Sequence, residues 1–426
     1  MKLLLVTLLT LFIAVPAVNA GQKDSSRVSA RPQPSDTTIS KEMSWNFRLK
    51  GFAGFFPASY NRVDGLLAGW GFNLSADEVL EIPGSRTRQV VPGKRYPEFS
   101  FELLVPTARS FVGGSLGVRQ RLSGRKQVDL GLNLDVGGYS NDIWRSSDPG
   151  AALAYLVLGR DRRYYHERRG GEVFLSSNIA GSLSVRLAFY HERVKSLWAT
   201  DTWTVFSSEL LKDNPPVTHG IDSGLRFRLE LKRLSEAAAL PEGWECALGV
   251  ENSGSPFGGD FEYRLYKFSA GYYRNLGRRN YLSAGLKAVT SDSRLPPHKL
   301  YSLGDNIRGV DTFEKDFDLF ERRGDRMWYL QLGWQRLINP PDNFITRLAY
   351  NWAMEFYFTS GVTFISTDDT DPLTLFTEGL DHLENGIGAG VSFTFSRTRV
   401  GICLEQSLNS SYQHGPYLSL RLEKSR

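Results

Sequence analysis

Apolar and polar residues alternate strictly along much of this chain. Residues 128–136 read VDLGLNLDV, with an apolar residue at every second position, and residues 225–232 read LRFRLELK with charges between the apolar positions. The same alternation occurs in 98–105, 328–335 and 387–395. Successive side chains of a strand point to opposite faces, whereas an amphipathic helix needs apolar residues three and four apart. The pattern therefore predicts β-strands with one apolar and one polar face.

All such segments together predict about sixteen antiparallel strands, which suits a transmembrane β-barrel. The predicted strands are 63–74, 97–106, 111–122, 127–139, 151–161, 170–178, 182–195, 221–234, 243–253, 260–275, 279–290, 326–337, 351–365, 386–396, 398–408 and 416–424. Connections after odd-numbered strands are mostly long (75–96, 196–220, 291–325, 366–385), and those after even-numbered strands are mostly short (107–110, 179–181, 276–278), with 140–150 and 338–350 as exceptions. Long connections outside and short periplasmic turns are typical of outer-membrane barrels.

The N-terminal residues predict export from the cytoplasm. Residues 1–20 have an early Lys2, an apolar core and a small-residue cleavage site ending at Ala20, as secretory signal peptides do. The apolar run is short for a spanning helix, which needs about 20 residues, but an N-terminal anchor is the alternative. Residues 21–44 are polar and predict a disordered periplasmic leader. We expect the barrel to fill 45–426, with 45–57 as an interfacial segment or an additional strand.

Composition narrows the class of protein. The 41 Gly, 26 Phe, 18 Tyr and 9 Trp suit tight turns and interfacial aromatic belts. A soluble all-β protein would share these features, but the export signal and the many alternating segments favour residence in the bacterial outer membrane. The 51 basic and 46 acidic residues are interleaved, so the net charge of +5 does not indicate nucleic-acid binding. Outer-membrane lipids are the expected partner, and no cofactor is expected.

The two cysteines are expected to be free thiols. In the alternating pattern Cys246 falls on the apolar face of its strand and Cys403 on the polar face of another, distant strand. A disulfide requires Cα atoms within about 7 Å of each other.

The longest connection, 291–325, carries the main candidate site. Gly304 and Gly309 permit backbone conformations closed to other residues. Between them, Ile307 precedes Arg308, whose planar guanidinium can bind a carboxylate with two hydrogen bonds. We expect this connection to fold into the barrel lumen, pinned by Arg308, with Glu355 as the candidate partner. A solvated loop arginine is the alternative.

Gly304 followed by Ile307-Arg308-Gly309 resembles the G…(V/I/L)RG(F/Y) motif of the bacterial surface antigen superfamily, which includes the BamA and TamA barrels and the FhaC-type secretion transporters. In that family the motif lies between strands eleven and twelve. Residues 60–66 and 164–170 also look similar to family members. The resemblance implies a role in outer-membrane biogenesis, protein or substrate translocation, or lipid handling, with unfolded or translocating polypeptide as a further partner. Since 21–44 is too short for a POTRA domain, we expect a single-barrel member.

No motif for catalysis or metal binding was found. The sequence lacks G-x-S-x-G, H-E-x-x-H and a P-loop, so we predict neither catalytic residues nor a metal site. Residues 165–168 (YHER) are repeated at 190–193. This repeat indicates either a specific binding site for a metal ion or a lipid headgroup, or ordinary interfacial residues at two strand ends that face headgroups. We favour the second interpretation. A passive porin-like channel remains the alternative function. An outer-membrane lipase, which needs Ser and His facing outward on adjacent strands, ranks last.

Overall fold

The computed structural model describes 38–50, 52–53, 56–57, 60–61, 63–81, 88–90, 97–110, 112–123, 128–140, 164–198, 214, 216–235, 241–277, 279–302, 323–339, 350–365, 371–372, 375, 379, 383–395, 398–408 and 416–424. Its long strands are β1 (Thr38–Lys50), β5 (Gly65–Glu81), β7 (Glu98–Pro106), β8 (Gly113–Ser123), β9 (Val128–Tyr139), β10 (His166–Asn178), β11 (Leu183–Ser196), β12 (Gly220–Ser235), β13 (Glu242–Ser253), β14 (Tyr263–Asn275), β15 (Asn280–Ser291), β18 (Arg326–Leu337), β19 (Tyr350–Phe364), β20 (Glu384–Phe395), β21 (Thr398–Ser407) and β22 (Tyr417–Lys424).

Short elements occupy the connections. They are β2 (Phe52–Ala53), β3 (Phe56–Pro57), β4 (Tyr60–Asn61), β6 (Arg88–Val90), β16 (Tyr301–Ser302), β17 (Arg323–Gly324) and the 3₁₀ turns η2 (Ser255–Phe257) and η3 (Pro297–Lys299). Among the described residues, no helix has the length and hydropathy needed to span a bilayer.

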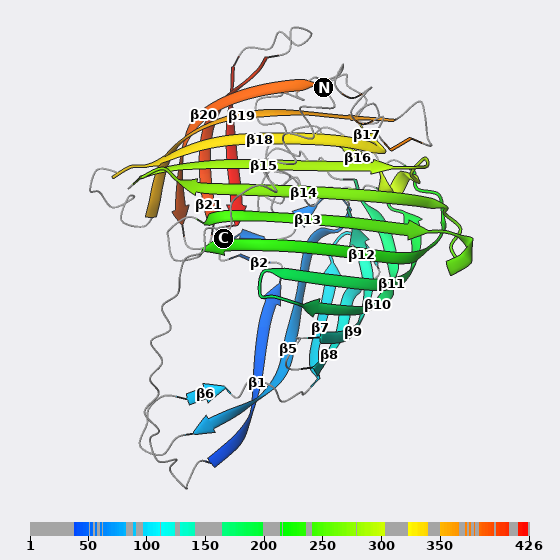
Figure 1. The fold of residues 1–426 in the computed structure, drawn as a ribbon. Coiled ribbons are helices and arrows are strands. Elements are labelled where there is room, and N and C mark those ends of the chain that lie inside the picture. The colour runs from blue at the N-terminus through cyan, green and yellow to red at the C-terminus, as the bar shows by residue number, and fades with distance from the viewer. Residues whose placement is uncertain are drawn as a thin grey trace.

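The long strands form one curved antiparallel sheet, in which each strand pairs with the next long strand along the chain (Figure 1). Together with β4 and β6 it is an 18-stranded sheet, so sixteen long strands make up the wall. Pairing only between chain neighbours is the topology of an up-and-down barrel. Within the described residues, no ladder joins β1 to β22, the first and last strands of the wall.

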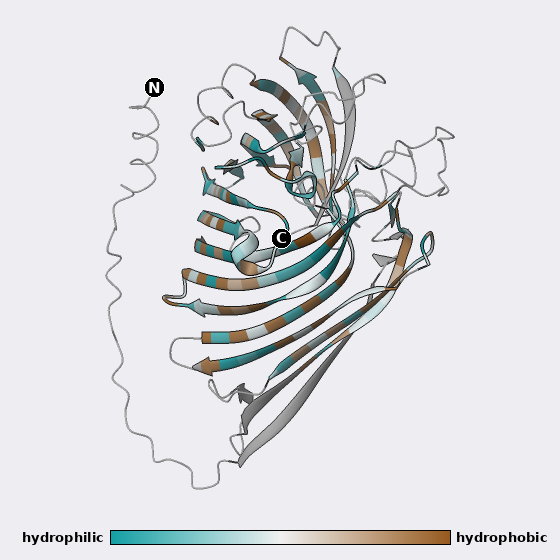
Figure 2. Cartoon of the chain, turned by 90° about the vertical axis from the view of Figure 1, so that its right-hand side faces the viewer, coloured by the Kyte–Doolittle hydropathy of each residue, from teal (hydrophilic) through white to brown (hydrophobic). Residues whose placement is uncertain are grey.

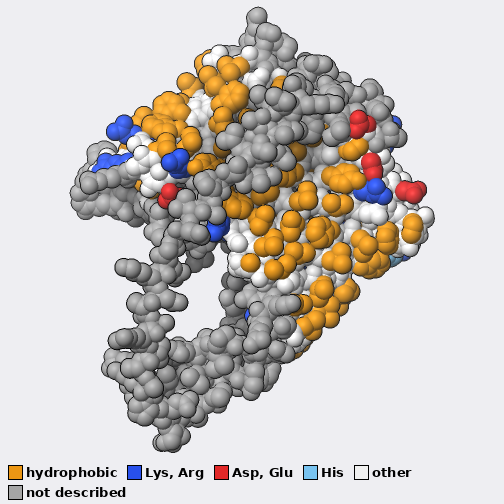
Figure 3. Space-filling model, viewed as in Figure 1, with side chains coloured by type: hydrophobic (Ala, Val, Ile, Leu, Met, Phe, Trp, Pro, Cys, Tyr) orange, Lys and Arg blue, Asp and Glu red, His pale blue; other side chains and the backbone are white. Residues whose placement is uncertain are grey.

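The two faces of the wall are inverted relative to a soluble protein. The outer face exposes large apolar side chains, among them Leu130, Leu134, Leu187, Phe227, Leu332, Phe356, Ile387 and Leu404, all 37–53% exposed. The inner face buries charged side chains, including Glu192, Asp222, Glu251, Glu355 and Glu405. Brown and teal alternate along the coloured strands in Figure 2, and hydrophobic side chains dominate the described outer surface in Figure 3. Only an apolar solvent favours this distribution, so the all-β chain is an outer-membrane β-barrel.

The expected strand count is confirmed, but two of the predicted segments are corrected. The strand β1 begins at Thr38, inside the expected leader 21–44, and pairs with β5 over its whole length. The predicted order, with a strand at 151–161 between those at 127–139 and 170–178, is wrong, because β9 pairs directly with β10 from Tyr139↔His166 onward. Residues 141–163, like the proposed signal peptide 1–20, lie outside the described residues.

This correction changes which connections share an end of the barrel. Counted from β1, the connections after odd-numbered wall strands are 51–64, 107–112, 140–165, 197–219, 254–262, 292–325, 365–383 and 408–416. We call their end the loop end and the opposite end, with 124–127, 179–182, 236–241, 276–279 and 396–397, the turn end. The connection 107–112 therefore lies at the loop end, and 140–150, an exception in the expected pattern, falls between β9 and β10, which are joined at the loop end. The connection 338–349 remains a long exception at the turn end, now joined by 82–97.

The predicted environment of the cysteines is confirmed. Both are free thiols; Cys403 is buried on the inner face beside Glu405, while Cys246 is partly exposed on the outer face.

Candidate functional site

The described start of the long connection between β15 and β18 turns into the barrel. We call residues 292–302 the anchor segment. Its Leu295 and Tyr301 are 4% and 7% exposed and pack in one apolar cluster with inward-facing residues of three wall strands. Those residues are Tyr263 and Leu265 of β14, Val289 of β15, and Met327 and Tyr329 of β18. The anchor segment thus lies against the inner wall.

The centre of the candidate site is a fully buried carboxylate, Asp222 on β12. Its oxygens accept hydrogen bonds from the hydroxyls of Tyr190 (3.1 Å), Tyr263 (3.0 Å) and Ser253 (2.9 Å). The anchor segment adds His298 Nε2 at 3.1 Å and Lys299 Nζ at 2.9 Å. A buried carboxylate is tolerated only when its oxygens are hydrogen-bonded and its charge is balanced. Here hydroxyl groups of the wall supply hydrogen bonds to the carboxylate, and the anchor segment supplies the positive charge that balances it.

Lys299 joins this carboxylate to a second one. Its Nζ lies 2.6 Å from Glu251 Oε1 on β13, and the Lys299 and Glu251 side chains are 9% and 5% exposed. Two buried carboxylates and a bridging ammonium form a unit in which no member can be removed without leaving a buried charge. Lys299 therefore forms the main ion pairs that hold the anchor segment against the wall.

His298 is held as a neutral ring. Burial lowers the pKa of His298 below its usual 6.5, an effect that the hydrogen bond with Asp222 opposes and the neighbouring Lys299 charge reinforces. The imidazole ring also stands edge-on to Phe261, with ring centroids 4.8 Å apart, and to His166 at 5.7 Å. A neutral His298 can still donate from Nε2 to Asp222, which places its proton on that nitrogen.

Around this centre, the inner wall carries a ladder of opposite charges. Arg226 on β12 binds Glu192 of β11 through two hydrogen bonds of 3.0 and 3.1 Å and lies 3.4 Å from Glu251. Lys267 on β14 lies 3.4 Å from the same Glu251. The Arg226 guanidinium also covers the Tyr190 ring at 3.7 Å. Opposite charges on neighbouring strands stabilise a sheet. These ion pairs therefore hold in place the wall carboxylates that bind the anchor segment.

Other loop-end connections pack beside the site. Val63, Tyr165 and Leu197, from three different connections, form a buried cluster. Arg109 pairs with Asp64, and burial lowers the pKa of Arg109 to about 10 while the charge of Glu167 opposes that shift. The two stretches that resembled the surface antigen family, 60–66 and 164–170, therefore meet at the loop end.

The predicted motif is not described by the structure. Gly304, Ile307, Arg308 and Gly309 lie in 303–322, outside the described residues, so their roles stay predictions. The segment's two ends are described: β16 pairs with β17, and Tyr301 and Arg323 are both 7% exposed.

Glu355, the candidate partner of Arg308, is buried on the inner face of β19. Its carboxylate accepts hydrogen bonds from Arg399 Nη2 of β21, at 2.6 Å, and from Ser392 of β20. Glu355 is thus paired with Arg399, whatever the position of Arg308.

The repeated YHER tetrapeptide does not build one site. His166 is 5% exposed and meets the anchor segment inside the barrel, so the expectation that it faces headgroups is wrong. His191 is exposed on the outer face, because it stands one residue out of phase with the inward-facing Tyr190 and Glu192. Within the described residues, no group of three or more His, Cys, Asp or Glu side chains is placed to hold a metal ion.

One Ser–His pair does lie across adjacent strands. His191 Nδ1 is 3.2 Å from Ser223 Oγ, and the two residues are cross-strand partners on β11 and β12. Ser223 is fully buried, however, and its hydroxyl also bonds the backbone oxygens of Tyr190 at 3.0 Å and Phe257 at 2.8 Å. A serine enclosed in this way is closed to a lipid substrate. It fastens η2 to the wall.

Sequence inspection missed His298 and Lys299 as the residues that hold the connection. The available signal was Pro296-Pro297 directly before His298-Lys299, since proline favours the first positions of a helical turn and so restricts the direction of the next residues. The acceptors could have been found from alternation, because Asp222 shares the inward phase of Arg226.

The fold resembles solved outer-membrane barrels, whereas no family model and no curated protein matches the sequence. BamA from Haemophilus ducreyi lacking POTRA domains 1–3 has a TM-score of 0.52 at 12% identity, over 91% of this chain and 74% of that one. CdiB from Acinetobacter baumannii (TM-score 0.43, 11% identity, 91% and 65%) and OccK2 from Pseudomonas aeruginosa (0.34, 12%, 91% and 96%) are more distant. The chain thus has a BamA-like barrel fold and spans 65% of CdiB.

Proposed function

We propose that this chain is a single-barrel member of the bacterial surface antigen superfamily that acts in outer-membrane biogenesis by moving a polypeptide or lipid substrate, rather than a passive channel. One observation carries the proposal: the anchor segment is fastened to the inner wall by Lys299 and His298 through two buried carboxylates. An anchor segment held by buried charges has a defined position against the inner wall, and loss of these charges would release it. An open pore for small solutes has no need of such a fastener.

Planar-bilayer recordings of the purified barrel test this proposal. We expect the wild-type protein to show little steady current, and Lys299→Met to open it, because the bridge between Asp222 and Glu251 is lost. Arg228→Met is the matched control, since Arg228 lies on the same strand as Asp222 but its side chain is 62% exposed and pairs only with the neighbouring Glu230 among the described ion pairs. A large, steady and ion-selective current through the wild type would instead favour the porin-like channel.

The substrate class needs a second measurement. Proteoliposomes containing the barrel are given either an unfolded outer-membrane barrel protein or a fluorescent phospholipid on one leaflet. Faster insertion of the polypeptide, or faster transfer of the lipid, than in Lys299→Met and protein-free vesicles identifies the substrate. Equal rates in all vesicles for both substrates would contradict a role in either process.

A further inference from the structure

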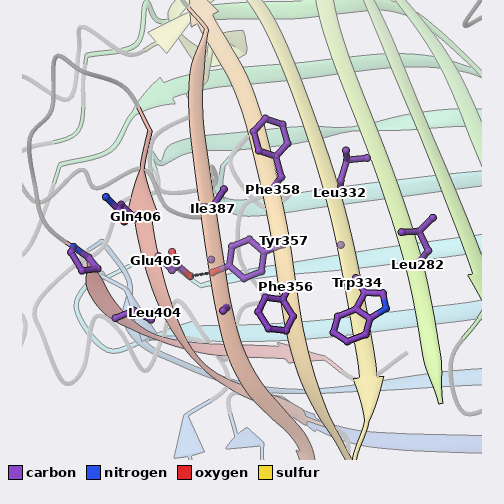
Figure 4. A pocket seen from close by; sticks show the side chains of 14 residues that line it. Leu282, Leu332, Trp334, Phe356, Tyr357, Phe358, Ile387, Leu404, Glu405 and Gln406 are labelled. Carbon is purple, nitrogen blue, oxygen red and sulfur yellow. Dashed lines mark hydrogen bonds between the residues drawn. The ribbon is translucent and has the colours of Figure 1, made fainter.

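The outer wall between β15 and β21 contains a groove of about 590 Å³, within the range of about 300–1,000 Å³ typical of small-molecule sites. Figure 4 shows outward side chains of β15, β18, β19, β20 and β21, with Trp334, Phe356 and Leu404 on one side and Leu332, Phe358 and Ile387 on the other. It lies on the face that exposes apolar side chains, so membrane hydrocarbon covers it.

Strand register explains the shape of the groove. One outward row crosses the sheet as Leu282↔Trp334↔Phe356↔Ala389↔Leu404, and a second as Leu332↔Phe358↔Ile387↔Gln406. The row between them points inward and includes Gly333 and Gly388. A Cβ on Gly388 would lie 2.3 Å from the Tyr357 ring, which crosses this glycine to bond Glu405. Ala389 leaves a notch in the first row between the larger Phe356 and Leu404.

The same row ends in a positive charge at the turn end. Arg274 of β14 is the cross-strand partner of Leu282 and is exposed on the outer face. Arg336 of β18, two residues beyond Trp334, is also outward and exposed. Among the described residues, no carboxylate forms an ion pair with either arginine. Figure 3 shows Lys and Arg side chains at the left margin of the hydrophobic surface, where β14, β15 and β18 meet the turn end.

The dimensions match one leaflet. From Arg274 to Leu404 the row crosses five strand spacings of about 4.8 Å, or roughly 24 Å. Barrel strands tilt about 35–45° from the membrane normal, so a row perpendicular to them rises by about 15 Å. That is half of the roughly 30 Å hydrocarbon core. The groove therefore runs from the headgroup level at the turn end to near the bilayer midplane.

We propose that this groove binds one glycerophospholipid of the turn-end leaflet, with its phosphate between Arg274 and Arg336 and one acyl chain between the two rows of side chains. The guanidinium groups supply charge-assisted hydrogen bonds to phosphate oxygens. The notch at Ala389 admits the chain. The site depends on the outer-membrane location and not on movement of the anchor segment, so it can hold whether or not the proposed function does.

Native mass spectrometry of the delipidated barrel, titrated with dipalmitoyl phosphatidylethanolamine in detergent, tests the site. We expect one tightly bound molecule on the wild type. Ala389→Leu, which fills the notch, should weaken binding at least tenfold, whereas Ala270→Leu, an outward alanine on β14 away from the groove, should not. Binding to Ala389→Leu equal to that of Ala270→Leu would overturn the proposal.

A second pair of variants tests the phosphate. Arg274→Gln with Arg336→Gln should weaken phosphatidylethanolamine at least tenfold and leave dipalmitoylglycerol, which has the same chains and no phosphate, unchanged. Arg193→Gln, an exposed outward arginine at the loop end of β11, is the control. Equal binding of both lipids to the wild type, or retention of lipopolysaccharide in place of phospholipid after purification, would overturn the choice of ligand. Folding of each variant is checked by heat-modifiable gel mobility, and quenching of Trp334 by brominated chains gives a readout in vesicles for any variant unstable in detergent.

Discussion

The charged side chains at the two ends of β12 differ in their exposure to water. Near the loop end, Asp222 is fully buried, bonded by three hydroxyls and bridged by Lys299. Toward the turn end, Arg228 and Glu230 form an ion pair whose side chains are 62% and 41% exposed. Asp222, Arg228 and Glu230 all lie on one strand and on its inner face. The difference is the anchor segment, which excludes water from the first pair, and an ion pair becomes structurally decisive only where water is excluded.

Loss of the buried bridge should have the largest effect. Lys299→Met leaves Asp222 and Glu251 buried without their shared cation and should cost about 3–5 kcal/mol. The measurement is urea unfolding of the barrel in lipid vesicles. A cost below about 1 kcal/mol, as expected for Arg228→Met in the exposed pair, would remove the distinction between the two ends.

Reversing the outer face should have the next largest effect. Leu229, an outward residue in the middle of β12, should cost about 2–4 kcal/mol when changed to Arg, because the charge enters the hydrocarbon. Arg228→Leu, one residue away on the inner face, should cost less. Equal costs in the same unfolding experiment would contradict the assignment of faces.

Acidification should loosen the loop end but not the turn end. Since burial holds the pKa of His298 below 6.5, the folded protein binds fewer protons than the unfolded chain between these two pKa values. The stability contributed by neutral His298 is therefore present above pH 6.5 and decreases as the pH falls through that window. Protease nicking within 292–325 should increase at low pH in the wild type, and His298→Gln should weaken that dependence. An identical pH profile in both proteins would show that another group titrates.

The smallest effect is expected at the exposed pair. Glu230→Gln removes a partner of Arg228 that water replaces, so its cost should lie within about 0–1 kcal/mol and decrease further at high salt. A large, salt-independent cost would mean that the turn end of the lumen is as dry as the loop end.

Alternation predicted most of the wall because each strand faces lipid on one side. Its failures were at segments where another signal competed. Residues 38–50 alternate, with apolar residues at 39, 43, 45, 47 and 49, but the polar composition of 21–44 suggested a leader, and 45–57 was expected to be an interfacial segment or an additional strand. Residues 151–161 (AALAYLVLGRD) are apolar enough to suggest a strand, but β9 pairs directly with β10, so the predicted order with a strand between them is wrong. Local pattern does not reveal which neighbours a strand finds.

The candidate site was less predictable from sequence. The entry of the long connection into the lumen was expected, but its described fasteners are His298 and Lys299. Their partners Asp222 and Glu251 lie 76 and 48 positions away along the chain. Such pairs follow from the way the anchor segment folds back across the inner face of the sheet, where it meets strands far from it in sequence.

Hydrogen exchange of the anchor segment tests the central claim most directly. If residues 292–302 are fastened inside the barrel, peptides covering Leu295 to Tyr301 should exchange nearly as slowly as the neighbouring strands β14 and β15, and Lys299→Met should speed them selectively. Rapid exchange in the wild type, equal to that of an exposed loop and unchanged by Lys299→Met, would contradict the account.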